Sequence, residues 1–391
     1  MADLSNCYNI ADIRRAAERR LPRALFEFID RATEDEIAVR NNRAAIERIR
    51  LVPRAPRDVS NRSLATTLFG QPVALPMAIA PTGAAGLMWY EAEMELARAA
   101  KAAGIPYTMA TGSMTPLEKV AREVGGRLWF QLYVWPDRDL AYALVRRVVE
   151  AGFEALVVTV DTPVQPNREY NTRNGFGFPF RPTAANVTDM LLHPRWLAGT
   201  LGRDIAAGGM PQQRNHPPEY NDPRTRAAVA ARFGLSDTIG IEEIKRLRDL
   251  FPGKLLVKGI VHPDDAREAV QRGVDGIIVS NHGGRQVDGA IPALEAFWQI
   301  AEAVGDAVPL LFDSGVRTGA DALKALALGT RMVGLGRPVM WALGVDGENG
   351  VHTYLRNFLA EFDLTLALSG YTRISDLRRE SLHVVEFATI I

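Results

Sequence analysis

The chain has 391 residues, 47% of them apolar, and its 46 lysines and arginines equal its 46 aspartates and glutamates in number. This length suffices for one large barrel or two ordinary domains, and the balanced charge gives no reason to expect a nucleic-acid partner. Cys7 is the only cysteine, which excludes an intramolecular disulfide and a cysteine metal cluster.

The two ends of the chain and its hydropathy predict a cytoplasmic protein. Met1–Asn6 lacks the basic and apolar regions of a signal peptide, and Phe387–Ile391 carries no peroxisomal or retention address. No uncharged apolar run reaches the about 18 residues that a membrane span needs.

A helical extension is expected over residues 1–70, with helices over Ile10–Arg20 and Leu21–Arg50. Within residues 71–391, apolar strand-like runs alternate with amphipathic stretches, which is typical of βα units. Eight such units predict one α/β domain, a (β/α)₈ TIM barrel, which the extension flanks or closes at its bottom. A doubly wound sheet would require Gly-x-Gly-x-x-Gly after its first strand, and the chain lacks it there. The predicted strands are Val73–Pro81, Tyr107–Thr111, Trp129–Val134, Ala155–Thr162, Lys254–Gly259, Gly276–His282, Pro309–Gly315 and Arg331–Pro338, and the helices between them include Glu91–Gly104, Asp137–Gly152, Pro263–Gly273 and Thr318–Gly329.

Residues 163–240 interrupt this rhythm with a long excursion after the fourth strand. Loops of this length are uncommon unless they are functional or disordered, and this one lies on the side where a barrel keeps its active site. Its middle part, Met190–Leu197, is apolar with basic residues between. We expect a lid over the barrel, and the alternative is a surface that contacts a membrane or a partner.

Polar and charged residues follow the apolar strands where each strand ends. The carboxyl ends of all barrel strands face one opening, so these side chains are expected to meet there. A buried Lys258 is especially costly unless it is paired or contacts a ligand. The residues at this opening are Thr82, Gly83, Thr111, Gln131, Tyr133, Thr159, Asp161, Lys258, His282, Arg285, Asp313 to Arg317, Gly336 and Arg337.

The segment Ser280–Gln286 carries the strongest chemical signal, because a histidine, two glycines and an arginine directly follow a buried strand. His282 has a side chain that can act as a base near neutral pH, and Asp161 could stabilise the imidazolium that results. Arg285 and Arg168 could clamp a carboxylate. Together with Lys258 they indicate proton abstraction from a carboxylate-bearing substrate beside an electron acceptor, and no metal is implied.

The last two strands end in Asp313–Arg317 and Gly334–Pro338. The loops after strands seven and eight are the usual phosphate site of such barrels, where glycine amides and cations hold the anion. Arg317 and Arg337 therefore predict a firmly held phosphate, which belongs either to a substrate or to a cofactor.

With these residues in place, the chain resembles the FMN-dependent L-2-hydroxy acid oxidase/dehydrogenase family, which includes glycolate oxidase, L-lactate dehydrogenase and (S)-mandelate dehydrogenase. The resemblance covers almost the whole chain. The motifs that carry it are Leu21-Pro22, Ala32–Glu36, Ala80-Pro81-Thr82, Phe130–Tyr133, Thr159–Thr162, Leu256–Gly259, Ser280–Gln286 and Lys324–Gly329.

The resemblance implies a role for each matching position. His282 matches the catalytic base, Asp161 its acidic partner, and Tyr133 the tyrosine that contacts the substrate. Arg285 and Arg168 match the carboxylate binders. Lys258 matches the lysine beside the flavin N1 edge. The remaining FMN positions are Pro81, Thr82, Gly83, Thr111, Gln131, Thr159 and Ser280 around the ring, and Asp313, Gly315, Arg317, Gly336 and Arg337 at the ribityl and phosphate groups.

Three departures from the family pattern bear on the substrate and the acceptor. Phe28 stands where relatives place a tyrosine that hydrogen-bonds the substrate carboxylate, which argues against a small acid. Gly112 stands where glycolate oxidase has a tryptophan, which leaves space for a large substrate side chain such as that of mandelate. Gly83 is alanine in many oxidases and glycine in mandelate-dehydrogenase-like members, which favours a dehydrogenase.

The resemblance also implies partners. The excursion is similar to the membrane-associating segment of mandelate and lactate dehydrogenases, so residues 185–215 are expected to make peripheral contact with the inner face of the cytoplasmic membrane and electrons to pass to a quinone. A homotetramer is expected by analogy. The alternatives are a soluble oxidase that forms hydrogen peroxide, a flavin isomerase on a similar barrel, and a phosphate-binding barrel kept as an interaction protein.

Overall fold

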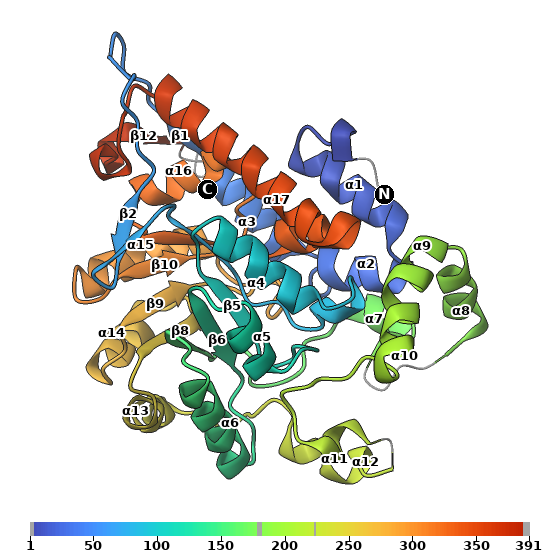
Figure 1. Ribbon diagram of the computed structural model, residues 1–391. Coiled ribbons are helices and arrows are strands. Elements are labelled where there is room, and N and C mark those ends of the chain that lie inside the picture. The colour runs from blue at the N-terminus through green and yellow to red at the C-terminus, as the bar shows by residue number, and fades with distance from the viewer. Residues whose placement is uncertain (1–3, 178–181, 223, 386–391) are drawn as a thin grey trace.

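The computed structural model describes residues 4–177, 182–222 and 224–385, so the expected absence of an address at Phe387–Ile391 lies outside the described residues. Eight parallel strands close into a barrel, as the sequence predicts, and helices surround it (Figure 1). In barrel order they are β4 (Met77–Ile79), β5 (Tyr107–Ala110), β6 (Leu128–Leu132), β7 (Ala155–Thr159), β8 (Lys254–Ile260), β9 (Gly276–Val279), β10 (Leu310–Phe312) and β11 (Met332–Leu335), and β11 pairs with β4.

The barrel strands are buried along nearly their whole length because side chains on one face fill the interior and those on the other meet the helices. This explains why they read as continuous apolar runs. The helices that follow the strands are α4 (Ala92–Ala102), α5 (Leu117–Glu123), α6 (Arg138–Glu150), α13 (Ile241–Leu250), α14 (Pro263–Gln271), α15 (Ala293–Val304), α16 (Gly319–Ala327) and α17 (Arg337–Leu368).

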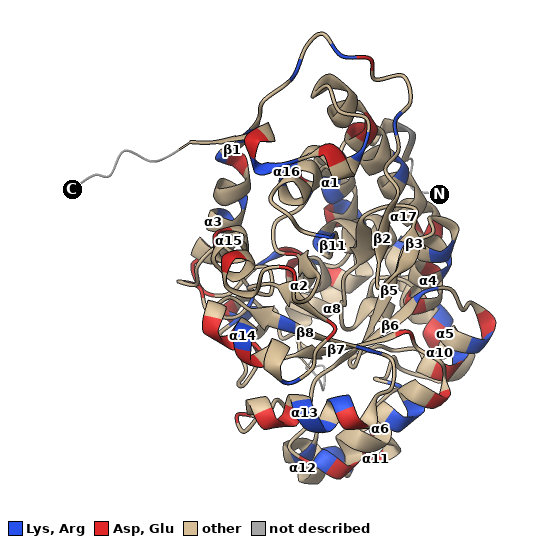
Figure 2. Ribbon diagram, turned by 90° about the vertical axis from the view of Figure 1, so that its left-hand side faces the viewer, with Lys and Arg blue, Asp and Glu red and all other residues tan. Residues whose placement is uncertain are grey.

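The outer helices carry both signs of charge. Figure 2 shows basic and acidic residues interspersed along α13 and α14. Several of these helices begin at side-chain caps: Asp137 accepts from the Leu140 amide, and Thr318 accepts from the Asp321 amide in a capping box. Among the described residues no helix is long and apolar enough to cross a membrane.

The N-terminal part corrects two predicted elements. Leu21–Arg50 is not one helix, because the backbone is extended at Arg31 and left-handed at Glu36. Val73–Pro81 is not one strand, because a hairpin strand ends at Val73 and the first barrel strand begins at Met77. The observed elements are α1 (Ile10–Arg20), α2 (Arg23–Asp30), α3 (Ile37–Glu47), β1 (Ile49–Leu51), β2 (Thr66–Leu68) and β3 (Gln71–Val73), and β1 pairs with β12 (Leu382–Val384).

The extension both flanks the barrel and covers its lower end. Helix α1 packs against α17 on the outside (Figure 1). The β2–β3 hairpin contributes Leu68 and Val73 to the apolar cluster inside the barrel, and Phe69 contacts Trp129 at the start of β6 with ring centroids 6.3 Å apart. The N-terminal ends of the strands are thereby closed.

The excursion folds into short helices. It docks on the barrel rim, where Trp196 Nε1 donates to the Leu87 carbonyl at 2.8 Å, and on α2, where the Arg23 amide donates to Asp189 at 2.7 Å. Its outer side exposes Leu191 and Leu192, which are 63% and 73% exposed. The helices are α7 (Glu169–Arg173), α8 (Ala184–Leu191), α9 (Pro194–Trp196), α10 (Gly202–Gly208), α11 (Pro218–Asn221) and α12 (Arg226–Val229), and α8 to α10 lie apart from α11 and α12 (Figure 1).

Candidate active site

One cavity of about 590 Å³ opens at the carboxyl ends of the barrel strands. Nearly all residues singled out from the sequence line it. Two do not: Asp161 stands behind His282, and Ser280 stands behind Lys258. The predicted residues that line the cavity are Phe28, Pro81, Thr82, Gly83, Thr111, Gly112, Gln131, Tyr133, Thr159, Arg168, Lys258, His282, Arg285, Asp313, Gly315, Arg317, Gly336 and Arg337.

The turn after β9 aims His282 into this cavity. His282, Gly283 and Gly284 take positive φ angles of 59°, 68° and 73° in succession, a conformation that costs a residue with a Cβ more than glycine. The two glycines also permit close packing: a Cβ at Gly283 would lie 2.7 Å from Arg337 Nη1, and one at Gly284 would lie 2.6 Å from the Val39 amide nitrogen. The turn therefore brings the histidine, Arg337 and helix α3 together.

His282 has a close partner at one ring nitrogen and a longer contact at the other. Its Nδ1 lies 2.9 Å from Asp161 Oδ1, while its Nε2 lies 3.5 Å from the Tyr133 hydroxyl. Burial lowers the pKa of His282, and Asp161 offsets only part of this effect. Burial alone would raise the pKa of Asp161, but His282 and Lys258 hold the pKa of that carboxyl below its usual range. The pair therefore presents a neutral imidazole with Nε2 toward the cavity at neutral pH.

Lys258 is 4% exposed and is paired, as its predicted burial requires. Its Nζ donates to Ser280 Oγ at 3.0 Å and lies 3.3 Å from Asp313 Oδ2. Burial would lower the pKa of Lys258, but Asp313 and Asp161 outweigh it and raise that pKa. A positive charge is thus fixed on the cavity wall.

Two arginines lie at the mouth of the site beside Phe28. Arg168 Nη2 donates to the Arg285 carbonyl at 3.0 Å, and the Arg285 guanidinium lies 5.3 Å from the centroid of the Phe28 ring. Burial lowers the pKa of Arg168 to about 10, with the positive charge of Arg285 acting in the same direction. Two neighbouring cations in a buried cavity favour a bound carboxylate.

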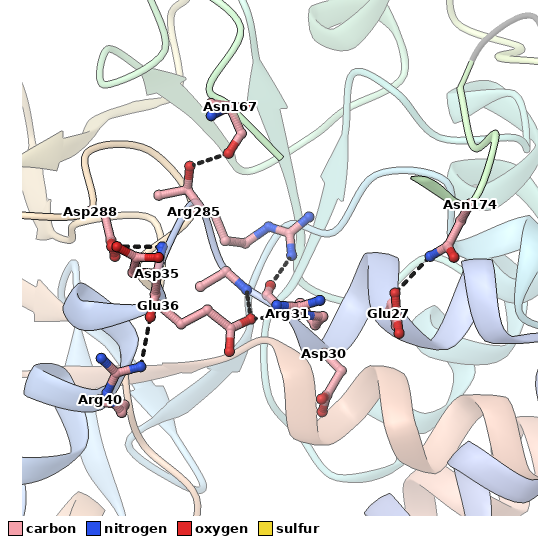
Figure 3. A network of polar contacts seen from close by, with 12 residues as sticks. Glu27, Asp30, Arg31, Asp35, Glu36, Arg40, Asn167, Asn174, Arg285 and Asp288 are labelled. Atoms are coloured by element: carbon pink, nitrogen blue, oxygen red, sulfur yellow. Dashed lines mark hydrogen bonds and ion pairs between the residues drawn. The ribbon is translucent and has the colours of Figure 1, made fainter. Parts of the chain in front are cut away.

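The connection between α2 and α3 holds the mouth of the site. Arg285 Nη1 donates to the Arg31 carbonyl at 2.9 Å, a contact visible in Figure 3. The Thr33 amide donates to the Gly284 carbonyl at 3.1 Å, and Asp288 accepts from the amides of Asp35 at 3.0 Å and Ala38 at 3.1 Å. The N-terminal extension thus positions the His282 turn, a role that its sequence does not signal.

Arg317 and Arg337 line the cavity where the last two barrel strands end, and the Arg31 carbonyl accepts from both Arg337 and Arg285. Arg337 donates to the carbonyls of Asp30, Gly283 and Arg31 at 2.8–3.0 Å, and Arg317 Nη1 donates to the Val316 carbonyl at 2.9 Å. Burial lowers the pKa of Arg317 to about 10 and that of Arg337 to about 9, and neighbouring arginines lower both further. Two buried cations with carbonyl partners, one after β10 and one at the start of α17, form a site for an anion such as phosphate.

The cavity wall at the ends of β5, β6 and β7 is polar. Thr111 Oγ1 donates to the Gln131 carbonyl at 2.7 Å, and Gln131 Nε2 donates to Thr159 Oγ1 at 3.0 Å. Gly83 and Gly112 lie side by side in the cavity wall: a Cβ at Gly112 would lie 3.8 Å from the Gly83 Cα. The absence of side chains here leaves room for a planar group.

Sequence reasoning missed several residues of the cavity wall. The excursion contributes Asn171, Phe176, Gln213, His216, Tyr220 and Phe233, and the segment after β6 contributes Trp135. The aromatic content of residues 163–240 was a signal, but only the folded chain shows which of these rings reach the site.

Comparisons with known proteins identify the family of the chain. A family model described as FMN-dependent dehydrogenase matches residues 17–384. (S)-Mandelate dehydrogenase of Pseudomonas putida is 38% identical over 377 residues, which are 96% of this chain and 94% of that protein. L-lactate dehydrogenase of Stenotrophomonas maltophilia is 39% identical over 373 residues, 95% of this chain and 97% of that protein.

Solved structures extend the similarity to the fold. The crystal structure of the monotopic membrane protein (S)-mandelate dehydrogenase matches with a TM-score of 0.91 at 38% identity, over 97% of this chain and 100% of that chain. Mandelate oxidase with benzoyl-formic acid matches with a TM-score of 0.80 at 36% identity, over 96% of this chain and 98% of that chain.

The residues present fit FMN. The buried cations Arg317 and Arg337 suit a phosphate, the wall at Gly83 and Gly112 leaves room for a planar ring, and Lys258 supplies a fixed positive charge. The resemblance read from the sequence is confirmed: the chain belongs to the FMN-dependent dehydrogenase family, whose FMN-dependent reaction is the oxidation of 2-hydroxy acids.

Proposed function

We propose that the protein oxidises a large L-2-hydroxy acid, with (S)-mandelate as the model substrate, to the 2-oxo acid, with His282 as the base. The observation that carries the proposal is the His282–Asp161 pair, 2.9 Å apart, in a cavity that also holds Tyr133, Arg168 and Arg285. These groups supply a base and a carboxylate clamp in one place.

Each side chain has a task in this reaction. Arg168 and Arg285 bind the substrate carboxylate, and the Tyr133 hydroxyl, 3.5 Å from His282 Nε2, orients the group that loses a proton. His282 accepts that proton at Nε2, and Asp161 stabilises the resulting imidazolium through Nδ1. Lys258, Arg317 and Arg337 would hold FMN, which would supply the acceptor for the two electrons that the substrate releases. Lys258 places positive charge beside that acceptor.

The proposal assigns FMN to the predicted positions. Ser280 and Asp313 orient Lys258, to which both are bonded or ion-paired. Arg317 and Arg337 hold the phosphate. The ring and the ribityl chain lie along the remaining cofactor positions, which are Pro81, Thr82, Gly83, Thr111, Gln131, Thr159, Gly315 and Gly336.

We further propose a quinone as the acceptor and peripheral attachment to a membrane through residues 185–215. Leu191, Leu192, Ile205 and Met210 are more than half exposed on this segment. The relative with a TM-score of 0.91 is described as a monotopic membrane protein. By the family resemblance, Gly83 matches the glycine of mandelate-dehydrogenase-like members rather than the alanine of many oxidases. A homotetramer is the assembly that the family resemblance implies.

One stopped-flow experiment tests the substrate and the acceptor. The flavin of the purified holoenzyme is reduced anaerobically with a panel of L-2-hydroxy acids, and the reduced enzyme is then mixed with oxygen or with a soluble quinone. We expect (S)-mandelate to bleach the flavin faster than glycolate or lactate, and the quinone to reoxidise it faster than oxygen. Preference for glycolate would refute the large substrate, and rapid peroxide formation would identify an oxidase.

A further inference from the structure

Residues 212–216 of the excursion, which we call the strap, form a loop that is bonded to the barrel. The Arg214 amide donates to the Ser113 carbonyl at 3.1 Å, and Asn215 Oδ1 accepts from the Leu117 amide at 3.0 Å. Arg147 Nη1 donates to the Asn215 carbonyl at 3.2 Å. Because these bonds reach both the β5–α5 loop and α6, the strap is fixed relative to the barrel rim.

Two further bonds hold the backbone of Gln213, which is part of the strap. Its carbonyl accepts from Asn221 Nδ2 at 2.9 Å and from the His216 amide at 3.3 Å. Its side-chain amide reaches the wall that Gly112 forms: a Cβ at Gly112 would lie 3.6 Å from Gln213 Nε2. Part of the space that the sequence assigned to a substrate side chain is thus taken by an amide of the protein.

This amide is a polar group in an aromatic surrounding. Trp135, His216, Tyr220 and Phe233 line the same cavity, with His216 stacked on Tyr220 at 4.4 Å between ring centroids and 4.8 Å from Trp135. Burial lowers the pKa of His216 to about 3, so this ring is neutral. Within the described part of the chain, the Gln213 side chain has no hydrogen-bond partner.

We propose that Gln213 determines substrate specificity by hydrogen-bonding a polar substituent on an aromatic substrate side chain. The inference rests on the proposed function, because it concerns the side chain of the 2-hydroxy acid that His282 acts on. The aromatic side chains that line the cavity suit an aromatic ring of the substrate. An amide that both donates and accepts hydrogen bonds suits a hydroxyl group on that ring. A methyl group in the same place would leave the amide without a partner, which is unfavourable once water is excluded.

The test compares two substrates whose ring substituents are similar in size. Flavin reduction is measured with (S)-4-hydroxymandelate and (S)-4-methylmandelate, and kcat/KM is expressed as the ratio of the two. We expect the wild-type protein to favour the hydroxylated acid and Gln213→Leu to lower the ratio by about 2- to 10-fold, the range of one neutral hydrogen bond. Gln213→Ala tests the same point without added apolar volume.

Gln212→Leu is the matched control. Gln212 is the neighbouring strap residue with the same side chain, but it does not line the active-site cavity. It lines a second cavity of about 350 Å³, which shares only His216 with the first. This variant should keep the wild-type ratio. Flavin content and thermal melting of each variant establish that it is folded.

Two results would overturn the inference: a wild-type ratio that does not favour the hydroxyl group, or an unchanged ratio in both Gln213 variants with FMN bound. If neither acid reduces the flavin, the proposed function fails. The corresponding 2-oxo acids, titrated against the flavin spectrum, then decide on Gln213 separately. A preference for the hydroxylated compound that Gln213→Leu removes supports the inference, and no such preference contradicts it.

Discussion

Two sets of buried charges line the cavity and are stabilised in different ways. In the first set, each group faces a carboxylate: His282 faces Asp161, and Lys258 faces Asp313. In the second set, Arg317 and Arg337 bond to backbone carbonyls, and burial lowers the pKa of both. The first arrangement tunes a proton acceptor, whereas the second requires an external anion to neutralise it.

This difference assigns chemistry to the His282 set and phosphate binding to the arginine set. A variant in the first set should therefore lower the rate of flavin reduction, and a variant in the second should lower the affinity for FMN. His282→Asn should lower the rate of flavin reduction by about 10²- to 10⁴-fold, the usual contribution of a general base, while FMN stays bound. Stopped-flow absorbance measures the rate, and the flavin content of the purified variant is the control. A near-normal rate would show that another group takes the proton.

The wild-type rate should also depend on pH in one direction. Only neutral His282 accepts a proton, and burial lowers its pKa below the ordinary histidine value of about 6.5. The rate is therefore expected to be level at neutral pH and to fall as the pH drops below that value. A rate that instead rises toward acid pH would contradict the assignment of His282 as the base.

Arg317→Met should weaken FMN binding by about 10- to 100-fold, the effect of one charged hydrogen bond, and leave the affinity for riboflavin unchanged. Methionine keeps apolar contact with Trp341, over which the guanidinium lies at 5.2 Å. Arg331→Met is the matched control, because that side chain is 58% exposed away from the cavity lining. Equal weakening for FMN and riboflavin would mean that Arg317 does not contact the phosphate.

The smallest expected effect lies at the mouth of the site. Phe28→Tyr adds a hydroxyl to a ring that already packs beside Arg285 and Phe176. The apparent KM for glycolate and lactate should fall by about 2- to 10-fold, because the new donor can reach the substrate carboxylate. Unchanged KM values for both acids would show that residue 28 does not reach the carboxylate.

The barrel and most of its rim could be predicted from the sequence because both follow from local patterns. The eight apolar runs give the strands, and the rule that strand ends share one rim places Lys258, His282 and Arg317 in one cavity without knowledge of any contact. The strand ends themselves were less exact, as the division of Val73–Pro81 shows.

The missing parts depend on contacts between distant segments. The carbonyls of Asp30 and Arg31 bind arginines more than 250 residues further along the chain, and backbone groups leave no trace in the sequence pattern. Gln213 reaches Gly112 only because the strap is bonded to the barrel. For this reason the sequence predicts only a long loop for the excursion, although the excursion supplies part of the cavity wall.

The most direct test of the division between the His282 set and the arginine set measures two quantities in His282→Asn and Arg317→Met side by side. They are the FMN dissociation constant and the rate of flavin reduction by (S)-mandelate at saturating FMN. We predict that His282→Asn loses the rate and keeps the affinity, and that Arg317→Met loses affinity and keeps the rate within a small factor. Loss of both quantities in both variants would contradict the account.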